Sequence, residues 1–196
     1  MNNNPQIIAL TGLAGSGKDE TTKYLKTILT NRPHTNTEHI AIADPLKHIT
    51  KQLYPSIEDR LLWPQTPQDR EDRETIKING LSTTRELLLS TARTLKQTHD
   101  DYVFVRILNE RIEQFLTQSI EFIIVSDVRY QTEADAIKHL GGIIIHVNRP
   151  DGHTVIDDAS ENGISVNSID YMIQNRGSIR DLQREIDHAC QVLGIV

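Results

Sequence analysis

The sequence has 196 residues, a formal net charge of −6, 37% hydrophobic residues and 24% charged residues. This length and composition predict one soluble globular domain with an appended lid, long enough to bury a sizeable core. The acidic balance argues against a general nucleic-acid-binding protein, which needs a basic face. An anionic ligand therefore has to be held by locally placed basic side chains.

No apolar stretch approaches the roughly 20 residues that span a bilayer, and no signal peptide precedes the first predicted strand. We therefore expect no membrane association. The single cysteine, Cys190, cannot form a disulfide within this sequence, which favours a reducing cytoplasm. Cys190 lies in the apolar spacing of the last predicted helix, so we interpret it as a core residue and not as a reactive thiol.

Strands and helices alternate along the sequence. Apolar runs predict strands at 6–11, 38–43, 121–127, 142–148 and 171–175, and helical periodicity is found at 17–31, 45–54, 83–98, 102–118, 131–140 and 178–193. Continuous apolar runs such as Phe122–Val125 are typical of parallel strands that are covered on both faces. The pattern predicts a doubly wound α/β sandwich whose ligand lies at the carboxyl ends of the strands.

The segment from Gly12 to Lys18 matches G-x-x-x-x-G-K, the phosphate-binding loop, between a predicted strand and a predicted helix. Glycines allow backbone N–H groups to turn inward, the helix N-terminus adds positive potential, and Lys18 supplies a charge for phosphates. The alternative is an ordinary Gly-rich turn. Asp19 stands where Ser or Thr is usual. A carboxylate there could bind Mg²⁺ directly or through water in place of the hydroxyl, but it also brings a charge that a triphosphate disfavours.

Asp44 and Lys47 follow the second predicted strand. Asp44 is a candidate N-cap for a helix whose first residue is Pro45, and both side chains are also candidates for the ligand crevice. The segment 55–82 contains a mixed charge run at 68–74. Such a run is typical of a solvated helix face or loop, and a flap over the substrate is the alternative.

Charged residues also follow the later strands. Asp127 and Arg129 end the buried strand at 121–127, where they can approach Mg²⁺ and a phosphate; a helix-capping Asp and a surface Arg are the alternatives. Arg149 precedes Pro150 and the polar segment 150–168, which we interpret as a mobile lid. Arg149 can close on a phosphoryl group or lie on the surface. Arg85 is on the helix at 83–98, where it is either a substrate ligand or a solvated charge.

Other classes of site are not indicated. The eight histidines show no zinc-binding pattern, and no G-x-S-x-G motif is present. Asn148–Asp151 is superficially like a guanine-specificity motif of GTPases, but Arg149 replaces the required Lys, and Asp127–Tyr130 lacks the Gly of a GTPase switch loop.

Several motifs occur together in one order. They are G-x-x-x-x-G-K-D at 12–19, A-D-P-L-K at 43–47, T-R-E-L-L at 84–88, V-S-D-V-R at 125–129, E-A-D-A at 133–136, H-V-N-R-P at 146–150, S-E at 160–161 and D-Y-M-I at 170–173, with Asn175 and Gly177. In this combination the chain resembles the deoxynucleoside monophosphate kinase family of bacteriophages, over nearly its whole length and most specifically over 121–182. Asp19 is a residue that members of this family share.

The resemblance implies a three-layer P-loop kinase sandwich with a central five-stranded parallel sheet, a monophosphate-binding helical region at 44–118 and a lid at 150–168, within a single domain over 1–196. It implies ATP-dependent phosphorylation of a deoxynucleoside 5′-monophosphate, with Mg²⁺, in the cytoplasm (of the host, if the protein is phage-encoded). Its partners would be small nucleotides, without nucleic acid or membrane; a homodimer is left open.

The resemblance also implies a role for each matching residue. The catalytic residues would be Lys18, Arg129 and Arg149. ATP would contact Gly12, Ala14, Gly15, Ser16, Gly17, Lys18, Asp19, Glu20, Asn175 and Gly177, the last two near the adenine. The acceptor would contact Asp44, Lys47, Arg85, Asp127, Arg129, Ser160 and Glu161. Mg²⁺ would be held by Asp19 and Asp127, directly or through water. Phosphoryl transfer needs alignment and charge neutralisation, so we assign no nucleophile.

Two segments depart from the family pattern. Leu88–Arg93 lacks the Leu-Gln and Gly-Thr residues that are frequent there, which leaves base preference open, and Asp158 replaces a His in the lid. Two alternatives follow: another small P-loop kinase, of the dephospho-coenzyme A or phosphomevalonate type, and a nucleotide-binding module without catalysis.

Overall fold

The computed structural model describes residues 5–33, 35–150 and 163–195 and divides the chain into two compact units. The first unit contains the chain up to Ile42 and again from Phe104 onward, and the second contains Ala43–Val103. The second unit is therefore an insertion in the sequence of the first. The predicted helical region at 44–118 extends beyond this unit, because the residues after Val103 belong to the first.

The first unit is built on a parallel sheet of five strands in the order β2-β5-β1-β6-β7. The strands are β1 (Gln6–Thr11), β2 (Thr37–Ile40), β5 (Phe122–Val128), β6 (Ile143–Asn148) and β7 (Tyr171–Gln174). The central strand β1 pairs Ile8 with Ile124 of β5 and Leu10 with Ile145 of β6. The predicted five-stranded parallel sheet is confirmed, and each predicted strand is found within three residues of its expected ends.

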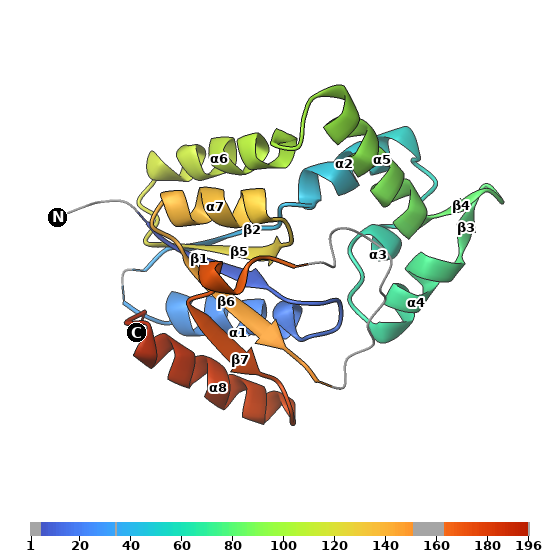
Figure 1. Ribbon diagram of the computed structural model, residues 1–196. Coiled ribbons are helices and arrows are strands. Elements are labelled where there is room, and N and C mark those ends of the chain that lie inside the picture. Colours follow the sequence, from blue (N-terminus) through green and yellow to red (C-terminus); the bar gives the residue numbers. More distant parts are fainter. Residues whose placement is uncertain (1–4, 34, 151–162, 196) are drawn as a thin grey trace. The chain divides into compact units, whose positions relative to one another are not determined.

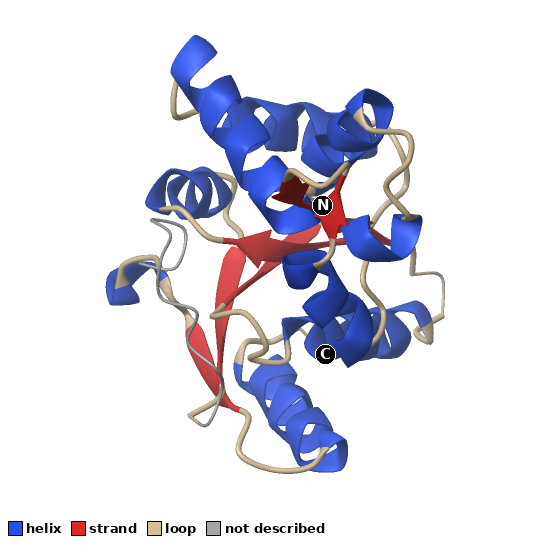
Figure 2. Ribbon diagram, turned by 90° about the vertical axis from the view of Figure 1, so that its right-hand side faces the viewer, coloured by secondary structure: helices blue, strands red, loops and turns tan. Residues whose placement is uncertain are grey.

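Helices cover both faces of this sheet, and the strands between them are twisted relative to one another (Figures 1 and 2). On one face lie α1 (Lys18–Thr30) and α8 (Ile179–Val192); on the other lie α6 (Val103–Leu116) and α7 (Gln131–His139). The predicted three-layer arrangement is therefore confirmed. No helix in the described part of the chain is long and apolar enough to cross a bilayer.

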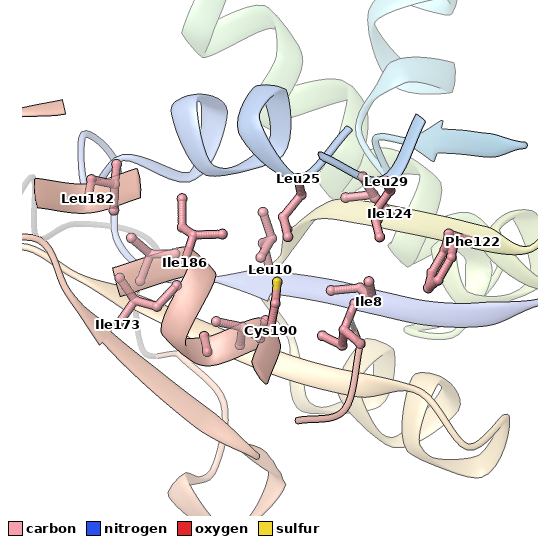
Figure 3. Packing of buried hydrophobic residues seen from close by; sticks show 14 residues of the cluster. Ile8, Leu10, Leu25, Leu29, Phe122, Ile124, Ile173, Leu182, Ile186 and Cys190 are labelled. Atoms are coloured by element: carbon pink, nitrogen blue, oxygen red, sulfur yellow. The ribbon is translucent and has the colours of Figure 1, made fainter. Parts of the chain in front are cut away.

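The core between the sheet and the α1–α8 layer is made of alternate residues of the strands (Figure 3). Ile8 and Leu10 of β1 pack there with Leu25 of α1 and Cys190 of α8, and all four are fully buried. Because successive strand residues point to opposite faces, the equally buried Ala9 belongs to the other side of the sheet. Cys190 is a core residue as predicted, and burial raises the pKa of its thiol to about 11.

The second unit is mainly helical. It contains α2 (Asp44–Leu53), α3 (Asp59–Leu62), α4 (Pro67–Thr75), the short hairpin of β3 (Lys77–Ile78) and β4 (Ser82–Thr83), and α5 (Thr84–Thr98). Its α2 and α4 contact α5, and Ile57, Leu61 and Leu62 are buried. The charge run at 68–74 lies on α4, which buries none of its residues, so the solvated-helix interpretation is confirmed.

Several of these helices begin at capping boxes. Ser178 accepts a hydrogen bond from the backbone of Asp181 in α8, and the Asp181 carboxylate accepts one from the backbone of Ser178. Thr83 and Glu86 form the same reciprocal pair at α5. Such pairs satisfy backbone N–H groups that the first turn of a helix leaves without partners.

Candidate phosphate-binding site

The loop between β1 and α1 lies where the strand order of the sheet reverses. Strand β1 pairs with β5 on one side and β6 on the other, and both are reached by crossovers. In open α/β sheets this switch point, at the carboxyl ends of the strands, is where ligands bind. The sequence motif at 12–18 therefore occupies the position in the fold that favours a phosphate ligand.

Two glycines of this loop are required by its geometry. Gly12 has φ +137°, and a Cβ there would collide with the carbonyl oxygen of Val147 at the end of β6. Gly17 has φ +108°, and a Cβ there would lie 2.6 Å from the side-chain nitrogen of Asn175. L-residues with side chains rarely adopt such angles, so the loop needs glycine at both positions.

The side chain of Lys18 folds back over the loop. Its Nζ donates hydrogen bonds to the carbonyl oxygens of Gly12, at 2.6 Å, and Leu13, at 2.8 Å. Among the described residues, the buried hydroxyl of Ser16 has no hydrogen-bond partner. The loop thus combines a cation and backbone N–H groups with the N-terminus of α1, an arrangement suited to an anion.

Asp127 lies near the carboxyl end of β5, where its Oδ1 accepts a 2.6 Å hydrogen bond from the backbone N–H of Ile42, just beyond β2. Asp127 does not cap α7: the carboxylate at the start of that helix belongs to Glu133, which accepts hydrogen bonds from the backbone N–H groups of Arg129 and Tyr130, at 2.8 and 3.1 Å. Asp127 is therefore not the N-cap of α7, which is Tyr130.

Asp19 is exposed in the first turn of α1, next to the loop. In the described part of the chain, no three His, Cys, Asp or Glu side chains form a cluster that could hold a metal ion by themselves. Mg²⁺ commonly uses one or two carboxylates together with water and substrate phosphates. Asp19 and Asp127 fit that limited contribution, at the end of the sheet where the loop lies.

The two arginines predicted near the phosphates follow β5 and β6, the two strands that flank β1. Arg129 is half-buried directly after β5, and its backbone is held by Glu133, whose side chain is 4% exposed. Arg149 is exposed directly after β6. The structure therefore brings Lys18, Asp127, Arg129 and Arg149 to the same edge of one sheet, because parallel strands share their carboxyl ends.

Asn175 follows β7, and its side chain is directed at the phosphate loop. The amide Nδ2 donates a 2.8 Å hydrogen bond to the carbonyl oxygen of Ser16. Gly177 lies at the start of α8, where a Cβ would crowd the capping carboxylate of Asp181. The predicted contact of Asn175 and Gly177 with ATP stays a prediction.

Two histidines of the sheet were given no role from the sequence. His146 of β6 is paired in register with Thr11, the last residue before the loop. Burial, and secondarily the charge of Lys18, lowers the pKa of His146 below its usual 6.5. His39 of β2 lies 2.8 Å from the hydroxyl of Ser126, through its Nε2. A lone histidine in an apolar strand carries no sequence signal for either arrangement.

Two candidate acceptor residues of the second unit, Asp44 and Lys47, form a small cluster with Trp63. Asp44 Oδ1 accepts hydrogen bonds from Lys47 Nζ, at 2.9 Å, and from Trp63 Nε1, at 3.2 Å. Helix α2 begins at Asp44 with Ala43 as its N-cap, so the prediction that Asp44 is the N-cap is wrong. Arg85 donates to Glu74 at 3.2 Å. Trp63 was missed, because nothing in its local pattern connects it to Asp44, nineteen positions earlier.

The predicted lid lies largely outside the described residues. Ser160, Glu161 and the unusual Asp158 fall in the segment 151–162. The described part of the predicted lid contains a short 3-10 helix, η2 (Val166–Ser168), which lies beside α7. There Gln131 of α7 donates a 2.9 Å hydrogen bond to the Ser168 hydroxyl.

Comparison with known proteins connects this site to a family. The family model described as deoxynucleotide monophosphate kinase matches residues 94–186. An Acanthamoeba polyphaga mimivirus protein named "Putative deoxynucleotide monophosphate kinase" is 28% identical over 95% of this chain and 98% of its own length. This chain is related to the deoxynucleotide monophosphate kinases. The deoxynucleotide monophosphate kinase of Enterobacteria phage T4 is 33% identical over 37% of this chain and 30% of its own length.

Two solved kinase structures are similar to this chain over most of its length. A sugar kinase from Janibacter sp. HTCC2649 is similar over 98% of this chain and 96% of its own, with a TM-score of 0.50 and 14% identity. The dephospho-CoA kinase of Campylobacter jejuni is similar over 96% and 97%, with a TM-score of 0.47 and 13% identity. At these sequence identities the similarity concerns the fold alone. The structure of the sugar kinase confirms the expected α/β kinase fold.

Proposed function

We propose that this protein transfers the γ-phosphoryl group of ATP to a deoxynucleoside 5′-monophosphate, giving the diphosphate. The observation that carries the proposal is the loop at 12–18: it has the required glycine geometry, it presents Lys18 at the switch point of the sheet, and it lies in a relative of deoxynucleotide monophosphate kinases.

In this reaction an oxygen of the acceptor phosphate attacks the γ-phosphorus, and the bond from that phosphorus to its bridging oxygen breaks, so ADP leaves. The protein forms no covalent bond to the phosphoryl group, and its task is to align the two nucleotides and neutralise charge. Lys18 and the loop N–H groups hold the donor phosphates. Arg129 and Arg149, at the ends of the two strands that flank β1, contact the transferring group or the acceptor phosphate.

Asp19 and Asp127 are the residues that would hold Mg²⁺, directly or through water. When bound, the ion neutralises charge on the donor phosphates. Asp19 replaces a neutral hydroxyl, so its carboxylate also adds negative charge beside the phosphates, and the ion compensates that charge.

The acceptor contacts Asp44, Lys47 and Arg85, together with Ser160 and Glu161 of the lid. Asp44 forms an ion pair with Lys47 at 2.9 Å, and Arg85 forms one with Glu74 at 3.2 Å. These pairs place the cations in defined positions before a ligand arrives. A dianionic phosphate competes with the carboxylates for both cations, because its charge-assisted hydrogen bonds are of the strong kind.

A panel of acceptors tests this proposal. The protein is incubated with ATP and Mg²⁺ and each of the four common deoxynucleoside monophosphates, the matching ribonucleotides, dephospho-coenzyme A and phosphomevalonate. ADP release and the phosphorylated product are measured by chromatography. We expect a deoxynucleoside diphosphate. Phosphorylation of dephospho-coenzyme A or phosphomevalonate, with no deoxynucleotide accepted, would reject the assignment. Nucleotide binding without any turnover would indicate a module that lacks catalysis.

A further inference from the structure

The side chain of Asn175 is buried beneath the phosphate loop, at the end of β7. It is 6% exposed, although it is an amide with four hydrogen-bonding positions. Its Nδ2 donates to the carbonyl oxygen of Ser16 at 2.8 Å, and its backbone N–H donates to the carbonyl oxygen of Asn148 at 2.7 Å. The residue is therefore attached to the end of β6 by its main chain and to the loop by its side chain.

The hydrogen bond to Ser16 sets the direction of one peptide group of the loop. In a planar trans peptide, the C=O and the following N–H point in opposite directions. Because Asn175 holds the C=O of Ser16 on its own side, the N–H of Gly17 points to the other side of the loop. A loop binds phosphate through such N–H groups, so their direction decides whether they face the ligand.

Close packing between Asn175 and Gly17 makes the direction of the Ser16–Gly17 peptide depend on both residues. A Cβ on Gly17 would lie 2.6 Å from Asn175 Nδ2 and 3.6 Å from its Cγ. The amide therefore fills the space that any side chain at 17 would need. Gly12 is confined in the same way by the Val147 carbonyl of β6. The ends of β6 and β7 thus support both glycines of the loop.

We propose that Asn175 is a positioning residue, which orients the peptide between Ser16 and Gly17 so that the loop binds the phosphates of a nucleoside triphosphate. This proposal rests on the proposed function in taking the loop to be the ATP phosphate site. Asn175 acts through the loop, so its loss weakens the binding of the donor and leaves the binding of the acceptor unchanged.

The test measures donor binding directly and independently of turnover. Binding of the non-hydrolysable analogue AMP-PNP with Mg²⁺ is measured by calorimetry for the wild-type protein, Asn175→Ala and the nearly isosteric Asn175→Asp, which places a carboxylate oxygen near the Ser16 carbonyl. We expect about tenfold weaker binding for Asn175→Ala, the order of one hydrogen bond, and a larger loss for Asn175→Asp. In turnover assays the KM for ATP rises and the KM for the deoxynucleotide does not.

Gln174→Ala is the matched control. Gln174 is the preceding residue, and its side chain accepts a 3.1 Å hydrogen bond from Asn148. The control therefore removes a neighbouring hydrogen bond outside the loop, and it should bind AMP-PNP as the wild-type protein does. Thermal unfolding identifies any variant that is not folded at the assay temperature; the isosteric Asn175→Asp then provides the comparison.

The outcomes separate this proposal from the proposed function. Wild-type affinity in folded Asn175→Ala and Asn175→Asp, or an equal loss in Gln174→Ala, overturns the role of Asn175. Analogue binding by the wild-type protein without phosphorylation of any acceptor rejects the kinase assignment, while the binding series still decides the role of Asn175. No analogue binding by the wild-type protein overturns both.

Discussion

At the level of single residues, Lys18 is the cation that belongs to the candidate phosphate loop itself. Its Nζ donates hydrogen bonds to two carbonyl oxygens of its own loop. We expect Lys18→Ala to lower kcat by about 10²- to 10³-fold, the range for losing one preorganised charge-stabilising donor. Steady-state kinetics measures the loss, and circular dichroism checks that the helical content is unchanged.

Lys23→Ala on the same helix is the control, because Lys23 is exposed and pairs with Glu20 at 3.0 Å. Its turnover should stay within a factor of about two of wild type, as expected for removal of one surface ion pair. Turnover near the wild-type rate in Lys18→Ala would contradict a catalytic role for the loop.

His146 provides a prediction for pH dependence. Its pKa is lowered in the folded protein, chiefly by burial and then by the charge of Lys18. The unfolded chain therefore binds the proton more readily, and the free energy of unfolding decreases as the pH falls through 6.5. We expect the free energy of unfolding of His146→Gln to decrease less over the same pH range, because glutamine does not titrate.

Urea unfolding of both proteins between about pH 5 and pH 8 measures this difference, since the range brackets the ordinary histidine pKa. The other seven histidines are common to both chains and cancel in the comparison. Parallel curves for the two proteins, with the same pH slope, would show that His146 does not contribute.

At the scale of elements, the start of α7 depends on a buried carboxylate. Glu133 is 4% exposed and accepts hydrogen bonds from the backbone N–H groups of Arg129 and Tyr130. We expect Glu133→Gln to lower the free energy of unfolding by about 1–3 kcal/mol, because a neutral amide cannot replace the charge-assisted bonds at a buried position. Urea unfolding measures the change.

Asp135→Asn is the control on the same helix. Asp135 is exposed, and its carboxylate accepts a hydrogen bond from Gln131 at 2.6 Å. The free energy of unfolding of Asp135→Asn should stay within about 0.5 kcal/mol of the wild-type value, as is usual for surface substitutions. If Glu133→Gln is no less stable than Asp135→Asn, the carboxylate is not what holds the turn that carries Arg129.

Most strands and helices could be predicted because the patterns that indicate them lie within short stretches of sequence. Apolar runs located the strands, and the helices were found within a few residues of their expected ends. The hairpin β3–β4 was missed, although Asn79 and Gly80 both have positive φ and are the residue pair that favours a two-residue turn. Its strands have two residues each, too short for an alternating pattern to be recognised.

At the scale of the whole molecule, the candidate donor residues belong to the first compact unit, and the candidate acceptor residues Asp44, Lys47 and Arg85 belong to the second. Trp63 is the single tryptophan, and it belongs to the second unit with Asp44 and Lys47. The Lys47 ammonium lies 6.0 Å from the centre of the Trp63 ring, whose Nε1 donates to Asp44. A phosphate that draws Lys47 away changes the surroundings of the ring. We therefore expect a deoxynucleoside monophosphate to change tryptophan fluorescence when it binds.

Fluorescence titration checks this, with AMP-PNP alone as the comparison ligand and Lys47→Met as the control variant. The response to the monophosphate should be lost in Lys47→Met, while AMP-PNP alone should give little change in either protein. Equal responses to both ligands, or an unchanged response in the variant, would mean that the cluster around Asp44 is not the acceptor side.

From the sequence alone we could predict the α/β class, most strand and helix segments, the phosphate loop and the resemblance to deoxynucleoside monophosphate kinases. These predictions depend on periodicity and on motifs of consecutive residues, such as Gly12–Lys18, and both can be recognised directly in the sequence. Only the folded chain shows which distant residues meet: Asn175 under Ser16, and Trp63 beside Asp44. Strand order and packing create these contacts, and neither is encoded in the spacing of residues along the chain.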